Sequence, residues 1–557
     1  MKIPVRYNHV GYTPYAEKMF FVNPAELGVD NMDGVFFRIA RAMLNAKEPI
    51  YEGRLLPGTF EHLGDCEYSG ENLWHGNFSP VFEVGNYVIQ LFRRDKDQGQ
   101  VLLFETLPFE ISDAWILRQL KANIKSFYYQ RSGVELLRPV AGKWARPAAH
   151  LDDKLKFHPS MQREGEWNAH GGWYDAGDYG KYIVNGGVSL ATLLLACELT
   201  GVPYGLKEEC RFEIDFFLRM QDVDGGVFFK VTPDHWDGFV SPRDSDLLQH
   251  RMILGKSTTS TLNFAGAIAA ASRVFRNENE TLAERCLQAA VAAYCWAESR
   301  PFVDYPHNTE GSGGYGDDHA DDEFFWARAM LYRELHDRGG TYAGLSVDSL
   351  REKLLEDMKG NPPKLGLDWR DTQNLGWIAL ALQDFDVELQ QKSRSALENT
   401  AREIIRLQKA DAYGISVRKF IWGSNGEICN HALTLAVVRR WTPSVDGDSL
   451  EFWCRELLNF VYGRNPVDVS FVTGSAWSSP MHPHHRICHS DRVVEPIPGL
   501  LVGGINADRQ DLHRAPHYPG SLPGLSYTDE RCSFASNETA INWNAPLTAV
   551  LAMLYKN

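Results

Sequence analysis

The sequence changes character near residue 112, and this change restricts the chain to a fold of two parts. Before that point, short runs rich in β-branched and aromatic residues alternate with turn residues, a pattern typical of strands. We predict strands at residues 18–22, 35–39, 81–84, 87–92 and 101–105, with a break at residues 85–86. Short strands at this density favour a small β-sandwich over residues 1–111.

Residues 112–557 are predicted to form a large helical part. Ser112 can cap the first helix, because a serine oxygen accepts the free amide groups of a helix start. Apolar residues recur at helical spacing in segments 117–127, 212–220, 262–274, 282–297, 322–335, 375–382, 397–407, 432–440, 450–462 and 545–555. Many amphipathic helices joined by long loops favour a helical toroid over a solenoid. Loops on such a scaffold often carry the chemistry.

Composition and charge exclude several classes of protein. Apolar residues make up 44% and charged residues 23% of the chain, as in ordinary globular proteins. The net charge of −15 repels phosphate backbones, so we expect no nucleic-acid partner. No run approaches the roughly 18 apolar residues that cross a bilayer, so we expect no membrane partner. No apolar signal segment begins the chain and the 9 cysteines form no CxxC pair, which predicts a cytoplasmic protein with reduced thiols.

Residues 171–182 form the first unusual segment. It contains four glycines, and Asp175 and Asp178 stand three residues apart. Two carboxylates held by a glycine-rich turn can grip one water molecule, and an ionised carboxylate can deprotonate that water as it attacks. An Asx-turn, a helix N-cap or a calcium loop fits the same residues. The segment alone leaves these alternatives open.

A histidine-rich segment follows at residues 480–489. Its spacing fits no standard zinc signature, so we predict no metal ligand there. His484 and Arg486 suit hydrogen bonding to a polyhydroxyl ligand, and a surface loop is the alternative. The chain also lacks a GxSxG nucleophile elbow and a complete phosphate-binding loop, which argues against serine hydrolases and nucleotide enzymes.

The third segment surrounds Glu538, which precedes the apolar C-terminal helix and lies among aromatic and amide residues. Partial desolvation raises the pKa of a glutamate and allows it to act as a general acid near neutral pH. A capping role at the helix start fits the local residues equally well.

Together, these segments resemble glycoside hydrolase family 9, the inverting cellulase family. Residues 172–178 are similar to its GWYDAGD segment, residues 470–486 to its His-x-Arg signature, and residues 527–545 to its Asp/Glu signature. Residues 8–12 resemble the start of the Ig-like domain that often precedes this catalytic domain. The resemblance implies a multidomain fold, in which an Ig-like β-sandwich at 1–111 precedes an all-α (α/α)6 toroid at 112–557.

The resemblance also implies roles for individual residues. Asp178 matches the general base, Asp175 the carboxylate that helps to hold the water, and Glu538 the general acid. The residues that match sugar-binding positions are His484, Arg486, Asp529 and Trp422. No metal ligand and no cofactor is implied. The chain departs from the family pattern at Ala476, Ser478, Ser533 and Phe534, which affects the sugar subsites and leaves the three carboxylates in place.

Glycoside hydrolysis with inversion needs an acid on the leaving oxygen and a base with room for water, so the two carboxyl groups lie about 6.5–9.5 Å apart. We expect an exo-acting enzyme on short β-1,4 oligosaccharides of glucose or glucosamine, because neither an export signal nor a cellulose-binding module is visible. The alternatives are an endo-β-1,4-glucanase acting on polymer, a non-catalytic carbohydrate-binding protein, and an unrelated (α/α) sugar phosphorylase or isomerase. The sequence does not indicate an oligomeric state.

Overall fold

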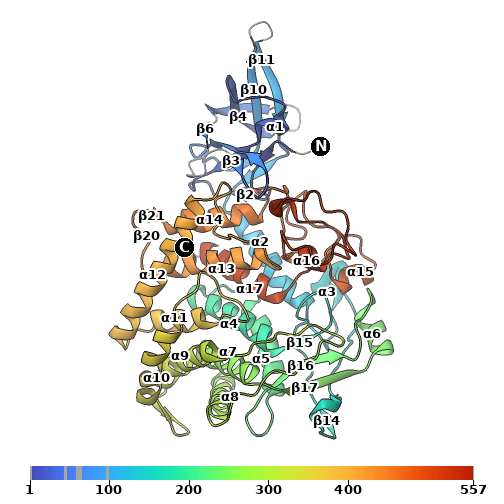
Figure 1. Cartoon of the computed structure of the whole chain (residues 1–557), viewed down its shortest axis with the longest axis vertical. Helices are drawn as coiled ribbons and strands as arrows, with labels where there is room; N and C mark the ends of the chain where they lie inside the picture. Colours follow the sequence, from blue (N-terminus) through green and yellow to red (C-terminus); the bar gives the residue numbers. More distant parts are fainter. Residues whose placement is uncertain (1–2, 43–46, 55, 58–64, 96–98, 556–557) are drawn as a thin grey trace. The chain divides into compact units, whose positions relative to one another are not determined.

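The computed structural model describes residues 3–42, 47–54, 56–57, 65–95 and 99–555 (Figure 1). Its internal contacts divide the chain into two compact units. The first unit consists of Met1–Ala122, Arg402–Pro483 and Pro498–Asn537. The second unit consists of Asn123–Ala401, His484–Ile497 and Glu538–Asn557. Each unit therefore joins segments that are far apart in the sequence.

The N-terminal part of the first unit contains two β-sheets that share one apolar core. One sheet has the order β1-β3-β9-β6, and the other has the order β2-β12-β10-β4-β5 with β11 beside β10. Phe20 of β3 meets Phe37 of β4 edge to face at 5.0 Å inside this core. The predicted sheet-rich N-terminal region is therefore confirmed. The strands are β1 (Val5–Arg6), β2 (Gly11–Tyr12), β3 (Met19–Val22), β4 (Val35–Ala42), β5 (Lys47–Arg54), β6 (Leu56–Pro57), β7 (Asp65–Cys66), β8 (Glu71–Asn72), β9 (Trp74–Asn77), β10 (Gly85–Asp95), β11 (Gly99–Glu105) and β12 (Phe109–Ile111).

One predicted strand is wrong. Residues 81–84 lie outside any strand, and Val81 donates its amide to Phe78 O at 2.9 Å in a turn. Phe82 and Val84 are 53% and 68% exposed, so only Val81 of the apolar run that suggested a strand enters the core. The predicted break at residues 85–86 is also wrong, because β10 begins there.

The rest of the first unit is helical. Ser112 accepts a hydrogen bond from Ala114 N at 3.0 Å, which confirms its predicted place at the start of α2. Helix α13 packs against α14, and both were predicted. The helices with residues in this unit are α1 (Pro24–Leu27), α2 (Ala114–Tyr129), α12 (Val387–Lys409), α13 (Ser424–Val438), α14 (Leu450–Val461) and α16 (Phe534–Asn537). Two short strands, β20 (Ser444–Val445) and β21 (Asp448–Ser449), precede α14.

The second unit is built from packed helices. Helix α4 contacts α17 and α7, α7 contacts α9, and α9 contacts α11, while α5 packs against α4 and α7, α8 against α7 and α9, and α10 against α9. This arrangement confirms the predicted helical body. The helices are α3 (Arg138–Ala141), α4 (Ile183–Thr200), α5 (Leu206–Met220), α6 (Pro242–Leu248), α7 (Thr258–Phe275), α8 (Glu280–Glu298), α9 (Asp321–Asp337), α10 (Val347–Gly360), α11 (Gln373–Leu382), α15 (Arg486–Ser490) and α17 (Ile541–Tyr555).

A five-stranded sheet also belongs to the second unit, in the order β14-β13-β17-β16-β15. The sequence analysis did not predict it. Every residue of β16 is buried, and β15 forms the end of the glycine-rich segment, so this sheet supports the site described below. Its strands are β13 (Leu155–Phe157), β14 (Glu166–Trp167), β15 (Lys181–Tyr182), β16 (Phe228–Pro233) and β17 (Arg251–Lys256), and β18 (Thr341–Tyr342) pairs separately with β19 (Leu345–Ser346).

Helix α4 is the one helix in the described part of the chain with the length and composition to cross a membrane. Its mean hydropathy is 1.6, but 83% of its residues are buried inside the protein. The core helix of a soluble protein passes the same test of length and composition, so this feature is explained by the helix packing of the second unit.

Candidate active site

The glycine-rich segment 171–182 folds into a tight loop in the second unit. Asp175 N donates to Gly180 O at 2.9 Å, and Gly180 N donates to Asp178 Oδ1 at 3.2 Å. The second bond is an Asx-type turn, as one alternative reading of the sequence predicted. Asp175 and Asp178 are 2% and 8% exposed. The turn therefore places two carboxyl groups in a largely desolvated position.

Gly177 is the point where three chain segments meet. Arg486 N donates to Gly177 O at 2.9 Å, and Gly177 packs so closely on the Glu538 side chain that a Cβ atom at this position would lie 3.3 Å from Glu538 Oε1. His484 forms a parallel bridge with Glu538. The structure thus brings the loop of Asp175 and Asp178 together with the histidine-rich segment and the Glu538 segment, as the resemblance implied.

Asp175 is held by two side chains that the sequence analysis did not single out. Asn185 Nδ2 donates to Asp175 Oδ1 at 2.7 Å, and the Tyr315 hydroxyl donates to Asp175 Oδ2. Burial raises the Asp175 pKa to about 7, although both hydrogen bonds act in the opposite direction. Ile541 N also donates to Asp175 O at 2.9 Å, which ties the loop to the start of α17.

Glu538 has the electrostatic environment of an acid. Burial raises its pKa well above the usual value, the Asp178 carboxylate adds to this effect, and the Arg486 guanidinium opposes it. Part of the Glu538 side chain remains open to solvent, so a ligand can reach the carboxyl group. A reachable carboxyl group whose pKa is raised in this way can serve as a proton donor to a leaving group.

Arg486 is almost fully buried and holds two loops together. Its Nε and Nη2 donate to Asp237 O at 3.1 and 2.9 Å, and its Nη1 donates to Gly177 O at 3.1 Å. The His484 ring packs edge to face on Phe239 at 5.3 Å. Both residues therefore lie beside the carboxyl groups, and Arg486 also fixes the backbone at Gly177.

His485 and Gln130 support the site from behind. His485 Nε2 lies 2.9 Å from Gln130 Oε1, and Gln130 O accepts the amide of Tyr174 at 2.8 Å. Burial lowers the His485 pKa to about 3, so the ring is neutral. The sequence analysis did not single out Gln130, because its partners lie far away in the sequence.

Asp529 and Trp422 belong to the first unit and are described within it. Asp529 Oδ2 accepts from Met481 N at 2.8 Å, and Oδ1 accepts from His482 N at 2.9 Å and Asn537 Nδ2 at 3.0 Å. Asp529 therefore fixes the backbone two residues before His484 and the side chain directly before Glu538. Trp422 is 42% exposed and packs on Phe534 at 5.3 Å.

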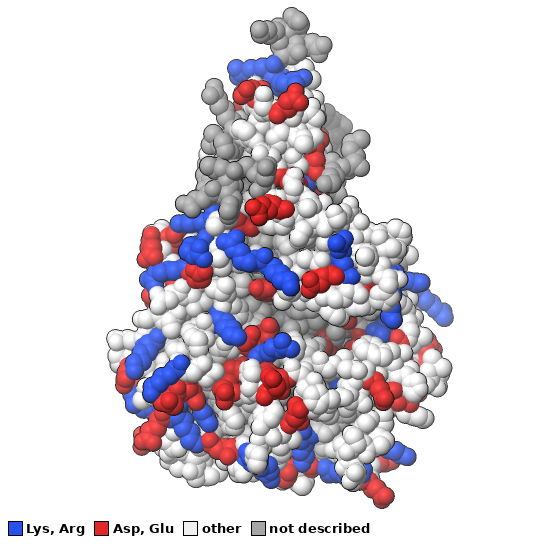
Figure 2. All heavy atoms as spheres, in the orientation of Figure 1, with Lys and Arg blue, Asp and Glu red and all other residues white. Residues whose placement is uncertain are grey.

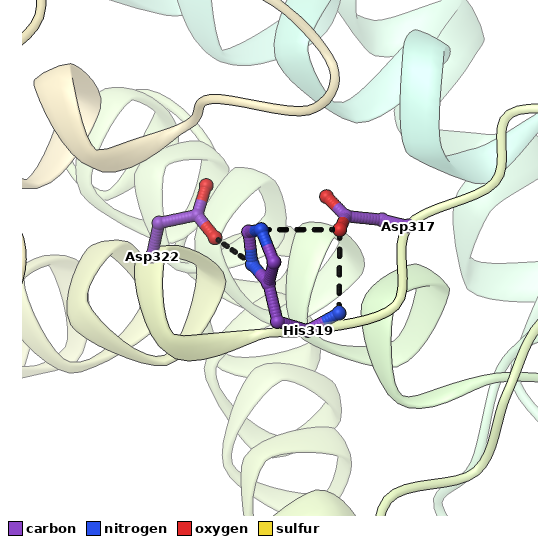
Figure 3. Close-up of side chains that lie close together, drawn as sticks. All are labelled: Asp317, His319 and Asp322. Atoms are coloured by element: carbon purple, nitrogen blue, oxygen red, sulfur yellow. Dashed lines mark hydrogen bonds and ion pairs between the residues drawn. The ribbon is translucent and has the colours of Figure 1, made fainter.

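One group of side chains in the described part of the chain can hold a metal ion, although the sequence analysis assigned no metal ligand. Asp317, His319 and Asp322 converge, with ligand atoms within 4.8 Å of one another (Figure 3). The His319 ring lies between the two carboxylates, 3.5 Å from each. Asp317 Oδ2 is buried and accepts no hydrogen bond from the described residues. Such oxygen ligands suit a hard divalent cation, and the sequence signal was the acidic run around His319.

Three comparisons with known proteins agree with this geometry. The profile described as glycosyl hydrolase family 9 matches residues 118–551. A xyloglucan-specific endo-beta-1,4-glucanase of Bacteroides ovatus is 32% identical, over 99% of this chain and 93% of that protein. A cellodextrinase of Butyrivibrio fibrisolvens is 29% identical, over 89% of this chain and 92% of that protein.

Among solved structures, this chain is similar to AaCel9A in complex with cellobiose-like isofagomine. The two superpose with a TM-score of 0.85 and 26% identity, over 100% of both chains. The likeness therefore includes the sheet-rich N-terminal region as well as the helical body.

Proposed function

Because the chain belongs to glycosyl hydrolase family 9, and is thus an O-glycosyl hydrolase, we propose that it cleaves β-1,4 linkages with inversion through Glu538 and Asp178. One observation carries this assignment. Gly177, in the loop of Asp175 and Asp178, packs directly against the Glu538 carboxyl group and against His484, which forms a bridge with Glu538. An acid and a base on either side of one linkage are what such hydrolysis requires.

The reaction follows from the protonation states. Protonated Glu538 gives its proton to the glycosidic oxygen, and the bond from that oxygen to the anomeric carbon breaks. Asp178 takes a proton from a water molecule that attacks the anomeric carbon from the opposite face, and Asp175 helps to hold that water. The product has inverted configuration, Glu538 is left ionised and Asp178 protonated, and exchange with solvent restores both groups.

The proposed sugar-binding residues are His484, Arg486, Asp529 and Trp422. His484 and Arg486 lie beside the carboxyl groups. The exposed Trp422 ring offers a flat apolar face, and Asp529 acts by holding the backbone at residues 481–482. The departures at residues 476, 478, 533 and 534 bear on the shape of these subsites.

The finer features of the fold support the same proposal. We infer a toroid of six helical hairpins over residues 112–557, because buried helices of the second unit contact one another in succession and carry outer partners. The β-sandwich at residues 1–111 is assigned as Ig-like on its two-sheet core and on the motif at residues 8–12. It acts as a brace for the catalytic part.

We propose short β-1,4 oligosaccharides as substrates, cleaved from one end. A relative named as a cellodextrinase and a structural neighbour in complex with cellobiose-like isofagomine support this choice. A cytoplasmic location fits it, since all nine cysteines are free and most are buried, as in a reducing compartment. Acidic and basic side chains are interspersed on the face seen in Figure 2, which suits a neutral sugar better than a nucleic acid.

The test is a product assay. The purified chain is incubated with cellobiose, cellohexaose, the glucosamine dimer and soluble carboxymethylcellulose, and the products and the viscosity are followed. Release of single sugars from one end, with little loss of viscosity, supports the proposal. A rapid fall in viscosity would instead assign the enzyme to the endo-β-1,4-glucanases. Asp178→Asn should abolish turnover while the circular dichroism spectrum stays unchanged, and near-wild-type rates would remove Asp178 from the mechanism.

A further inference from the structure

A long connection between α8 and α9 contains a side chain that contacts the loop of Asp175 and Asp178. Residues 299–320 contain neither helix nor strand, and Tyr315 within them donates its hydroxyl hydrogen to Asp175 Oδ2. A connection of this length is flexible unless other contacts fix it. The position of the Tyr315 hydroxyl therefore depends on what holds the connection in place.

The side chain of Lys230 in β16 is a buried charge that binds several residues of this connection. Its side chain is 0% exposed. Its Nζ donates to Asn308 O and Gly313 O, both at 2.9 Å, and lies 3.3 and 3.2 Å from Ser312 O and Oγ. These acceptors lie at both ends of residues 308–313, so one ammonium group closes this turn. Burial lowers the Lys230 pKa to about 8, and the Asp178 carboxylate acts against that shift.

Other contacts press the same turn against β16. Tyr182 donates to Gly313 O at 2.6 Å, and Thr232 Oγ1 lies 2.7 Å from Ser312 Oγ. Gly311 has a φ of 74° and packs so closely that a Cβ atom would lie 1.9 Å from Pro233 O. The turn therefore has little freedom to shift along the strand. Gly313 O accepts from both Tyr182 and Lys230, whereas Asn308 O and Ser312 O accept from Lys230, and buried acceptors need such a donor.

We propose that Lys230 is a positioning residue for hydrolysis, which fixes the turn at residues 308–313 so that Tyr315 stays hydrogen-bonded to Asp175. This inference rests on the proposed role of Asp175 in holding the attacking water. Lys230 itself need not touch the substrate.

The consequence of losing Lys230 has a defined direction. A looser turn weakens the Tyr315 hydrogen bond, and this bond favours the ionised form of Asp175. The Asp175 pKa then rises above about 7, and less of the enzyme has the ionised form at neutral pH. The charged and titratable groups around Asp175 and Lys230 are Asp178, Glu538, Glu213, Tyr182 and Tyr315.

The test compares Lys230→Met, Tyr315→Phe and the double variant in hydrolysis of cellotetraose. We expect Lys230→Met to lower kcat at least tenfold while KM stays within about threefold of the wild-type value. The acid limb of its pH profile should shift to higher pH. Tyr315→Phe should do the same, and adding Lys230→Met to it should change kcat less than twofold, because both act on one hydrogen bond.

Lys18→Met is the matched control. Lys18 is equally buried, its Nζ donates to Pro14 O at 2.5 Å and Ala16 O at 2.7 Å, and burial lowers its pKa to about 8. It lies in the sandwich of the first unit, so its loss should lower Tm and leave kcat and the pH profile unchanged. If both lysine variants lose kcat equally, Lys230 contributes only to stability, and the inference is wrong.

Two further results separate the inference from the proposed function. If Asp175→Asn is inactive while folded Lys230→Met keeps the wild-type kcat and pH profile, the role of Asp175 stands and the inference is wrong. If Lys230→Met does not fold, Thr232→Val loosens the same turn at almost constant shape and should move the acid limb in the same direction. Unchanged profiles in Thr232→Val and Tyr315→Phe would overturn the inference.

Discussion

Replacing Glu538 by glutamine tests the acid half of the mechanism directly. Glutamine keeps the shape of protonated glutamic acid, but it has no acidic proton. A positioned general acid contributes about 10²–10⁴-fold to such a step, so kcat on cellotetraose should fall by about that factor. The fold should be unaffected, because burial already favours the uncharged form of the wild-type side chain.

The assay uses two substrates that differ in their need for an acid. In cellotetraose the leaving oxygen must be protonated, whereas 2,4-dinitrophenyl β-cellobioside has a leaving group that departs as an anion. Glu538→Gln should therefore lose most of its activity on the first substrate and little on the second. The nearby Glu530→Gln is the control, since Glu530 pairs with His517 at the surface, and both rates should stay at the wild-type level.

The pH profile gives a second readout for the same variant. Glu538 must be protonated to act, so wild-type activity is lost as pH rises through its raised pKa. The residual activity of Glu538→Gln should lack this alkaline limb, because glutamine does not titrate. Equal losses on both substrates, or an alkaline limb that persists in the variant, would refute the assignment of Glu538 as the acid.

Two more predictions concern Asp175 and Trp422. The Asp175 pKa is raised to about 7 in the folded protein, so the folded state binds more protons and wild-type stability falls as pH rises from about 4 to 7. Asp175→Asn removes this pH dependence. The difference in the free energy of unfolding, variant minus wild type, should therefore increase by about 3–4 kcal/mol between pH 4 and pH 8 in denaturant titrations. A difference that stays constant with pH would contradict the raised pKa of Asp175. Trp422→Ala should raise KM for cellohexaose about tenfold with kcat preserved. Trp422→Phe retains an aromatic ring, so its KM should stay near the wild-type value. Equal KM values for the wild type and both variants would exclude Trp422 from substrate binding.

The carboxyl groups of the site could be predicted because each stands in a distinctive local segment. Asp175 and Asp178 share a glycine-rich loop, and Glu538 precedes an apolar helix. Tyr315 and Lys230 carry no such signal. Lys230 lies in β16, a strand that was not predicted from the sequence, and its hydrogen-bond acceptors lie about eighty residues further along the chain. Only the packed structure brings these groups together.

The fold shows the same division between local and distant causes. Amphipathic helices such as α8 and α14 were predicted because their apolar stripes are visible in the sequence. Helix α10 was missed, since only Leu350 and Leu354 of it are buried and most of its surface is charged. The sheet beneath the site was missed because its strands are short, and β13 pairs with β17 across about ninety-five residues.

Gly177 allows the loop that carries Asp178, the proposed base, to pack against Glu538, the proposed acid, without a side chain between them. A Cβ atom at this position would lie 2.0 Å from His484 O and 3.3 Å from Glu538 Oε1, so no other residue fits without moving the backbone. Its amide faces Glu538, and its carbonyl accepts from Arg486. The relative positions of Asp178 and Glu538 are therefore set by backbone contacts, which fix geometry more tightly than flexible side chains do. The glycine between Ala176 and Asp178 is thus a requirement of the catalytic geometry as well as of the turn.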